Sequence, residues 1–266
     1  MADEEAAEDA GVRTSNGFNA EGAEVALRSR RNVVANVSVI IPVLNEAGSI
    51  GDVVASMPWS DIAECIVVDN GSTDGSGEIA AAAGARVIQS PRGYGAAMHA
   101  GSESALATSD ILVYMDGDGQ DAVEEMARVV GPIAKDEADF VITSRILGKR
   151  ESGSMQFSQV MAGFVVGWLT RVFYKFHYTD MAAFRAIRRS SLEQMHMEEM
   201  TYGWNLEMQL KAIQLRLRIL EVPAHYRRRA GGESKVSGNV RASWETVKRI
   251  FIVFRRVRRK FRKVGQ

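Results

Sequence analysis

Residues 37–46 read VSVIIPVLNE, a short apolar run rich in β-branched side chains that ends in polar residues. A short run that is apolar at both odd and even positions is typical of a strand buried on both faces. A helical stretch is predicted directly after it, at residues 49–57, and Pro58 closes that stretch. We therefore interpret residues 37–43 as the first strand of a sheet that helices cover on both sides.

The same alternation of apolar runs and helical stretches repeats along the chain. Further strands are predicted at residues 65–68, 86–89, 111–115 and 140–143, with helices at residues 76–83, 96–107 and 123–134. Strict alternation with short connections favours right-handed βαβ units, and hence an α/β fold with a mostly parallel central sheet flanked by helices. Ligands of such sheets bind beyond the carboxyl ends of the strands, so the residues that follow each strand are the functional candidates.

The composition excludes several classes of protein. With 46% hydrophobic and 25% charged residues, the 266-residue chain can bury a substantial core, which excludes collagen, coiled-coil and wholly disordered proteins. The longest run without a charged residue, residues 152–170, is interrupted by Ser, Gln and Gly, which excludes a polytopic membrane protein. One cysteine, Cys65, allows no internal disulfide or thiolate metal cage. With no signal-peptide pattern either, we expect a cytoplasmic setting.

The formal net charge of zero hides a strong asymmetry. Residues 1–24 hold seven acidic residues against one arginine, whereas residues 226–266 hold fourteen Lys or Arg against two Glu. Residues 1–35 show no sustained apolar period and are predicted to form a disordered acidic leader. The basic end is expected to meet an anionic partner.

The loop after the fourth predicted strand, DGDGQD at residues 116–121, carries the most chemistry. Asp116 and Asp118 on a Gly-rich turn can point at one cation, and Gln120 adds an amide oxygen. Ligands that are all oxygen favour Mg²⁺ or Mn²⁺. Simple turn formation is the alternative, but a position directly after a buried strand favours a site. Phosphate oxygens would complete such a site, which points to a nucleotide-diphosphate substrate.

Four motifs in order resemble the family 2 glycosyltransferases. They are VSVIIPVLNE (37–46), CIVVDNGSTDGS (65–76), DGDGQ (116–120) and RRRAGGESKVSG (227–238). Within the family, the chain is most similar to polyprenyl-phosphate glycosyltransferases of the dolichol-phosphate mannose synthase type, over residues 37–239. The resemblance implies a GT-A fold over residues 36–239, an inverting mechanism, a nucleotide-diphosphate sugar donor and a polyprenyl-phosphate acceptor.

The resemblance also implies roles for individual residues. Asp116 and Asp118, with Gln120, would hold the donor diphosphate through the metal. The residues expected to contact the donor are Pro42, Asn45, Glu46, Asp69, Gly71, Ser72, Arg92, Gly95, Asp116 and Gly117. Asp69 could instead be a turn carboxylate. Asn70 and Gly119 replace residues common in the mannose synthases, so the sugar stays open between mannose and glucose, and the base between GDP and UDP.

The segment PRGYG at residues 91–95 precedes a predicted helix and suggests a dinucleotide fingerprint at first. Met98 stands where the third glycine of that fingerprint would be, so a nicotinamide oxidoreductase is disfavoured. A loop against the donor diphosphate, with Arg92 as an anion contact, or a plain turn are the remaining interpretations.

Basic residues are the candidates for the acceptor phosphate. Arg145 follows the fifth predicted strand, and Arg229, Ser234 and Lys235 follow a strand predicted at residues 217–222. Converging Arg, Lys and hydroxyl donors form a phosphate site, although a solvated basic loop is the alternative. A phosphate oxygen is already anionic, so it can attack the sugar without a general base. Asp180 and Glu207 are weaker candidates, for sugar contact or, with another acceptor, for base catalysis, and Asp180 could equally cap a helix.

Two segments are candidates for contact with a membrane. The helix predicted at residues 157–176 has a continuous apolar core, residues 160–169, that is too short to span a bilayer. It is either a core helix or an interfacial one, and the resemblance favours interface helices within residues 157–190. In residues 240–266, apolar and basic residues recur on opposite faces, a pattern typical of a helix on anionic lipid.

We therefore expect a cytoplasmic enzyme that is peripheral on the inner face of the membrane through residues 240–266. Nucleic acid is not an expected partner, because it would not explain the aromatic residues on the apolar face. A family 2 enzyme with another lipid or a soluble acceptor is the closest alternative. A non-catalytic membrane-surface or nucleic-acid-binding protein is another, against which the presence of Asp116 and Asp118 argues.

Overall fold

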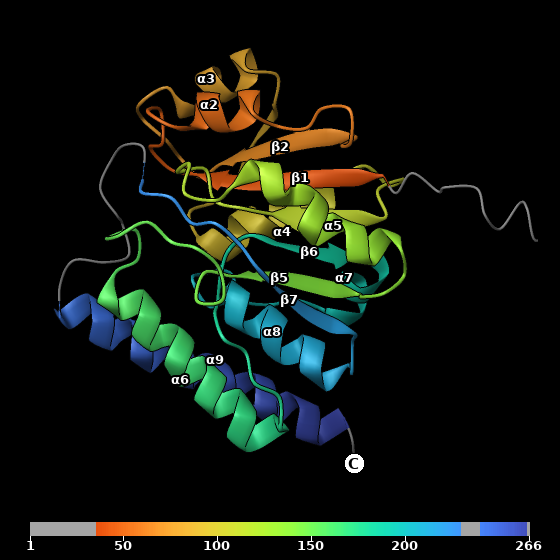
Figure 1. Cartoon of the computed structure of the whole chain (residues 1–266), viewed down its shortest axis with the longest axis vertical. Helices are drawn as coiled ribbons and strands as arrows, with labels where there is room; N and C mark the ends of the chain where they lie inside the picture. Colours follow the sequence, from red (N-terminus) through yellow and green to blue (C-terminus); the bar gives the residue numbers. More distant parts are fainter. Residues whose placement is uncertain (1–35, 230–239, 265–266) are drawn as a thin grey trace, which may run out of the picture. The chain divides into compact units, whose positions relative to one another are not determined.

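The fold is built on a mostly parallel seven-stranded sheet, as the alternating pattern predicts (Figure 1). The computed structural model describes residues 36–229 and 240–264, so the predicted leader, residues 1–35, lies outside the described residues. The strand order is β3-β2-β1-β4-β6-β5-β7, and β6 runs antiparallel to both of its neighbours. The strands are β1 (Val37–Val43), β2 (Glu64–Asp69), β3 (Arg86–Gln89), β4 (Ile111–Tyr114), β5 (Phe140–Ser144), β6 (Arg185–Arg188) and β7 (Ile219–Pro223).

Strand β6 corrects the expectation of interface helices throughout residues 157–190. Between residues 157 and 188 only α6 (Phe157–Tyr174) is helical, and β6 enters the sheet between β4 and β5. In the register, Ile187 lies opposite Leu112 on one side and Phe140 on the other. The sequence of β6, RAIR, is short and begins and ends in arginine, so no apolar run marks it.

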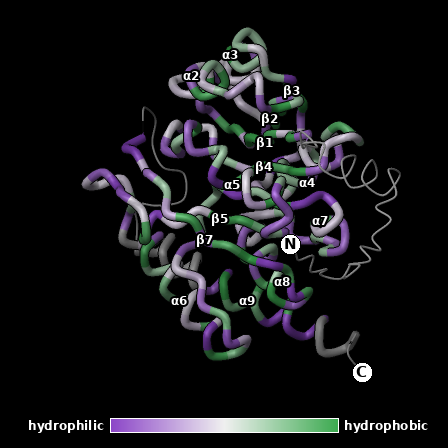
Figure 2. Tube along the Cα trace, turned by 45° about the vertical axis from the view of Figure 1, so that its right-hand side comes forward, coloured by the Kyte–Doolittle hydropathy of each residue, from purple (hydrophilic) through white to green (hydrophobic). Residues whose placement is uncertain are grey.

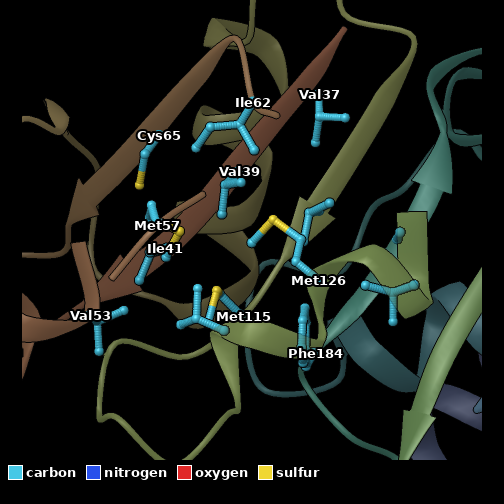
Figure 3. Packing of buried hydrophobic residues seen from close by; sticks show 14 of the residues in the cluster. Val37, Val39, Ile41, Val53, Met57, Ile62, Cys65, Met115, Met126 and Phe184 are labelled. Carbon is cyan, nitrogen blue, oxygen red and sulfur yellow. The ribbon is translucent and has the colours of Figure 1, made fainter. Parts of the chain in front are cut away.

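Helices cover both faces of the sheet. One face carries α2 (Ile50–Ala55), α3 (Ser76–Ala82), the 3₁₀ turn η1 (Val123–Glu125) and α5 (Met126–Ala134), and the other carries α4 (Tyr94–Ser104), α7 (Arg189–Met195) and α8 (Trp204–Gln214). Val39 and Ile41 pack with Met126 in the first core (Figure 3), whereas Ile40 packs with Trp204 in the second. Successive side chains of a strand point to opposite faces, which explains why β1 is apolar at every position but Ser38 and Pro42.

A third core lies between α6, α8 and α9 (Val240–Val264), and Figure 1 shows α6 and α9 side by side. Phe254 and Val257 of α9 are 3% and 2% exposed, because they pack in this core with Leu206 and Leu210 of α8. For these two residues the prediction that the apolar stripe faces lipid is therefore wrong, whereas Phe251 of the same stripe is exposed. The helix also belongs to the same compact unit as the sheet rather than forming a separate segment.

Helix α6 has both a buried face, as expected of a core helix, and an exposed apolar face, as expected of an interfacial helix. Val166 and Leu169 are buried in the third core. Its opposite face exposes Met161, Phe164, Trp168 and Val172 to 37–68%. Figure 2 shows the hydrophobic residues along this helix, yet within the described ranges no helix is long and apolar enough to cross a membrane.

Candidate active site

A cavity of about 710 Å³ opens at the carboxyl ends of β1, β4 and β5. Eight of the predicted site residues line it, from four separate parts of the chain: Pro42, Glu46, Asp116, Gly117, Asp118, Gln120, Arg145 and Arg229. The parallel strands bring them together because their carboxyl ends meet at one edge of the sheet. On its other side, the cavity is lined by residues of α6, α8 and α9, including Ala162, Leu206 and Ile250.

The acidic loop after β4 is held in shape by its own carboxylates. The backbone N–H of Asp116 donates to Asp121 Oδ2 over 3.1 Å, and that of Gln120 donates to Asp118 Oδ1 over 3.1 Å. Burial, then the nearby charges of Asp118 and Asp121, raises the pKa of Asp116 well above its usual value. Burial and the charge of Asp118 raise the pKa of Asp121 to about 7. A carboxylate cluster of this kind favours a cation beside it.

The donor set of this loop fits a hard divalent cation. Asp116 and Asp118 offer carboxylate oxygens on the cavity wall, the ligand type that Mg²⁺ and Mn²⁺ prefer. In the part of the chain that the structure describes, no three His, Cys, Asp or Glu side chains lie close enough to hold a metal by themselves. An ion held by Asp116 and Asp118 would therefore take further oxygens from substrate or solvent.

Gln120 ties the acidic loop to the chain that follows β7. Its Nε2 donates to the carbonyl oxygens of Ser154 and Arg227, each over 3.1 Å, and its Oε1 accepts a hydrogen bond of 3.1 Å from Tyr226. The side chain therefore positions the loop, and its role as a metal ligand stays a prediction.

Arg145 and Asp180 form one buried ion pair, with Nε 2.7 Å from Oδ2 and Nη2 2.7 Å from Oδ1. Burial opposes ionisation of Asp180, but the hydrogen bonds from Arg145 outweigh it and hold the pKa of Asp180 below its usual value. Asp180 is 1% exposed and does not line the cavity. This carboxylate holds Arg145, whose guanidinium also lies over the Tyr226 ring. A catalytic role for Asp180 stays a prediction.

Arg229 is the other predicted phosphate contact on the cavity wall. It pairs with Glu46, and its Nη1 lies 3.4 Å from Asp118 Oδ2. The loop after β7 therefore reaches the acidic loop and the end of β1 at once. Ser234 and Lys235 lie outside the described residues.

Several predicted donor contacts do not line the cavity. Asp69 accepts hydrogen bonds from the Ser72 N–H and from Gln89, over 2.8 and 3.0 Å. Asn45, at a φ of 54°, donates its backbone N–H to Ser72 Oγ over 3.0 Å, which joins the loops after β1 and β2. Gly71, with a φ of 87°, provides a left-handed turn in the loop after β2, and Arg92 is exposed beside it. Their contacts with a donor stay predictions.

The glycines of PRGYG have a structural reason. A Cβ atom on Gly95 would lie 2.1 Å from the carbonyl oxygen of Glu199, because the segment before α8 packs directly on the start of α4. The carbonyl of Met200 accepts the Ala96 N–H over 3.0 Å. Glu207 is also structural, since its Oε2 accepts the backbone N–H groups of Glu198 and Glu199.

Sequence reasoning missed several residues of the cavity wall. The Tyr94 hydroxyl lies 3.4 Å from Asp116 Oδ1 and accepts a hydrogen bond of 3.4 Å from the Asn205 side chain. Asn70 Oδ1 accepts a hydrogen bond of 3.0 Å from the Gly93 N–H. Tyr94 lies within PRGYG and Asn70 within CIVVDNGSTDGS, so both belong to segments that the sequence analysis had already singled out. No local signal marks Thr201 just before α8, Asn205 in α8 or Arg249 in α9. These residues reach the cavity through long-range packing of these segments.

Comparisons with known proteins identify the family of the chain. A family model described as glycosyl transferase family 2 matches residues 38–195. A glycosyltransferase of Mycobacterium tuberculosis is 33% identical over 210 residues, which cover 78% of this chain and 92% of the relative. The undecaprenyl-phosphate mannosyltransferase of Micrococcus luteus is 31% identical over 223 residues, which cover 77% of this chain and 88% of the relative.

The fold is that of the GT-A glycosyltransferases. A crystal structure of glucosyl-3-phosphoglycerate synthase from Mycobacterium tuberculosis, in complex with Mn²⁺, UDP-glucose and phosphoglyceric acid, superposes with a TM-score of 0.64. The match covers 90% of this chain and 84% of that chain at 20% identity. Because the family model spans most of the sheet and the relatives match almost throughout their own lengths, the chain belongs to glycosyl transferase family 2 and is a glycosyltransferase.

Proposed function

We propose that this glycosyltransferase moves a hexose, mannose or glucose, from a nucleotide-diphosphate sugar to a polyprenyl phosphate, with inversion. The observation that carries the proposal is a single cavity with two kinds of wall. Glu46, Asp116 and Asp118 make one part acidic, whereas Ala162 and Leu206 belong to an apolar part between α6, α8 and α9. A metal-bound diphosphate suits the first part, and an isoprenoid chain suits the second.

The relatives support each half of this proposal separately. The name of the Micrococcus luteus relative supports a polyprenyl-phosphate acceptor and mannose. The Mycobacterium tuberculosis structure, which contains Mn²⁺ and UDP-glucose, supports a divalent metal and a nucleotide sugar. The phosphoglyceric acid in that structure is a soluble phosphate monoester. It is therefore the alternative acceptor that the experiment compares with a lipid phosphate.

The reaction needs little covalent help from the protein. An acceptor phosphate oxygen attacks the anomeric carbon as the bond between that carbon and the donor diphosphate breaks, and the diphosphate leaves with the electron pair. Asp116 and Asp118 would hold Mg²⁺ or Mn²⁺, which when bound neutralises charge on the leaving diphosphate. Arg145, fixed by Asp180, orients the acceptor phosphate, and the protein contributes positioning and exclusion of water.

The test combines ligand binding with turnover. GDP-mannose or a UDP-sugar is expected to raise the melting temperature with Mn²⁺ present and much less with EDTA, since ligands that bind only the native state stabilise it. The donor that binds is then offered farnesyl phosphate or phosphoglyceric acid as acceptor. Transfer to farnesyl phosphate supports the proposal, and transfer to phosphoglyceric acid alone would contradict it.

We also propose that the outer face of α6 contacts the inner membrane surface. Phe164 and Trp168 are 68% and 52% exposed, and Arg171 and Lys175 near the end of this helix are also exposed. Apolar side chains with nearby cations favour an anionic bilayer surface. In this arrangement α9 packs with α6 and α8 in the third core. Deletion of residues 241–266 would therefore expose Leu206 and Leu210, and it would not be a clean test of membrane attachment.

Replacing both Phe164 and Trp168 by Glu is expected to release the protein from vesicles of phosphatidylglycerol and phosphatidylcholine. The two changes remove exposed apolar area and add negative charge. Each should cost about 1 kcal/mol or more of binding free energy, so the affinity for vesicles should fall more than tenfold. Vesicle co-sedimentation measures the effect. Trp59→Glu is the matched control, because Trp59 is 41% exposed beside α3. Equal release by the control, or undiminished binding of the double variant, would contradict the α6 surface.

A further inference from the structure

Arg249 of α9 lines the cavity, although the sequence pattern assigned this helix to the membrane surface. Its Nη2 lies 3.2 Å from Glu199 Oε1 and also donates to Thr201 Oγ1. The side chain is 46% exposed, whereas the neighbouring Ile250 is 4% exposed and lines the same cavity. Helix α9 therefore brings a cation and an apolar side chain to the cavity together.

The other two cavity arginines that sequence reasoning assigned to the phosphate are held by carboxylates of the site itself. Both oxygens of Asp180 bind Arg145, and Arg229 pairs with Glu46 and lies near Asp118. A phosphate that approached either of these guanidinium groups would meet their carboxylate partners nearby. A further cation on the cavity wall would make the cavity more favourable for a dianion.

Glu199 is shared, in contrast, by two arginines. Arg256 lies 2.7 Å from Oε2, closer than Arg249 lies to Oε1, and Glu199 also accepts hydrogen bonds from Thr201. If Arg249 turned toward a ligand, Glu199 would keep Arg256 and Thr201 as partners. The movement therefore leaves no buried carboxylate without a counter-charge, which would otherwise be costly.

We infer that Arg249 binds the phosphate monoester of the acceptor, and that α9 is thus part of the acceptor site. That the acceptor is a lipid phosphate rests on the proposed function. That Arg249 binds a phosphate monoester does not, because phosphoglyceric acid carries the same group. The planar guanidinium can make two parallel hydrogen bonds to one phosphate. Ala162, Leu206 and Ile250 provide the adjoining apolar wall for an isoprenoid chain.

The experiment compares Arg249→Met, Arg249→Lys and Arg255→Met in the full-length chain. Arg255 is exposed on the same helix and does not line the cavity, so its replacement removes the same charge from α9 without touching the site. Binding of farnesyl phosphate, phosphoglyceric acid and uncharged farnesol is measured by calorimetry, and the KM values of donor and acceptor by turnover. Melting temperatures and vesicle binding are recorded for each variant.

Arg249→Met is expected to weaken binding of the phosphate acceptor, and to raise its KM, by about tenfold or more, the effect of one lost charged hydrogen bond. The donor KM and farnesol binding should not change, Arg249→Lys should restore part of the affinity, and Arg255→Met should resemble the wild type.

Unchanged phosphate binding by Arg249→Met, or an equal loss for Arg255→Met, overturns the inference. Arg249-dependent binding of phosphoglyceric acid without binding of farnesyl phosphate supports Arg249 but contradicts the lipid acceptor. If the wild type binds neither farnesyl phosphate nor phosphoglyceric acid, both the role of Arg249 and the proposed phosphate acceptor are overturned.

Discussion

Replacing Asp118 by Asn is expected to abolish sugar transfer while the melting temperature stays close to that of the wild type. The carboxylate of Asp118 lines the cavity together with Asp116 and lies next to Arg229. Asn keeps an oxygen that can accept the Gln120 N–H, but it removes the negative charge on which a divalent ion depends. Lost stabilisation of the leaving diphosphate is expected to lower kcat on the order of a thousand-fold.

Two measurements separate this effect from unfolding. The variant should lose the Mn²⁺-dependent rise in melting temperature that the nucleotide sugar produces, while its melting temperature without ligand is retained. Asp110→Asn is the matched control, because Asp110 is exposed at the opposite end of β4. If Asp118→Asn turned over donor at the wild-type rate, the acidic loop would have no part in the reaction.

Replacing Arg145 by Met is expected to lower the free energy of unfolding by about 3–5 kcal/mol, the usual cost of breaking a buried ion pair from one side. Asp180 is 1% exposed, so its carboxylate would remain buried, and among the described residues only the backbone N–H groups of residues 145 and 181 would still donate to it. Chemical denaturation at neutral pH measures the loss. The same variant should also lose transfer activity, because the acceptor phosphate would lose a positioned cation.

The double variant Arg145→Met with Asp180→Asn distinguishes stability from function. An uncharged amide at residue 180 is cheaper to bury, so the double variant should be more stable than Arg145→Met alone. Its activity should stay low, because the cation is still missing. A double variant no more stable than the single one, or an active single variant, would contradict this account of the pair.

The pH dependence of the wild type provides an independent check. Arg145 holds the pKa of Asp180 below its usual value, so the pair contributes stability that is fully present above about pH 4, the ordinary Asp value. That contribution is lost as the pH falls through the lower, folded-state pKa. The difference in stability between the wild type and Arg145→Met should therefore shrink in acid.

The central part of the fold could be predicted from short segments of sequence. The apolar run of β1 implies burial on both faces, and Val39 and Ile40 do lie in opposite cores. The acidic loop directly follows β4, so parallel topology was enough to predict that it meets the end of β1 at the cavity. Both inferences work because strand periodicity and strand ends are local properties of the chain.

The acceptor side of the cavity could be predicted only in part. Arg145 and Arg229 follow strands, as expected for site residues, and both line the cavity. Asn205 and Arg249 lie in helices, at positions that their own sequences do not distinguish from other polar positions. They reach the cavity because α8 and α9 pack against α6, and such long-range contacts leave no periodic signal in one sequence.

By itself, the sequence determined the parallel sheet, the acidic loop at its edge, the family, and the presence of one apolar face on α9. Only the tertiary structure decided that β6 enters the sheet, that Asp180 binds Arg145, and that Phe254 and Val257 are covered by protein rather than lipid. The reason is that the hydrophobic effect is not directional: an amphipathic helix gains similarly from any apolar surface that removes it from water. Which surface covers each face depends on residues far away in the chain.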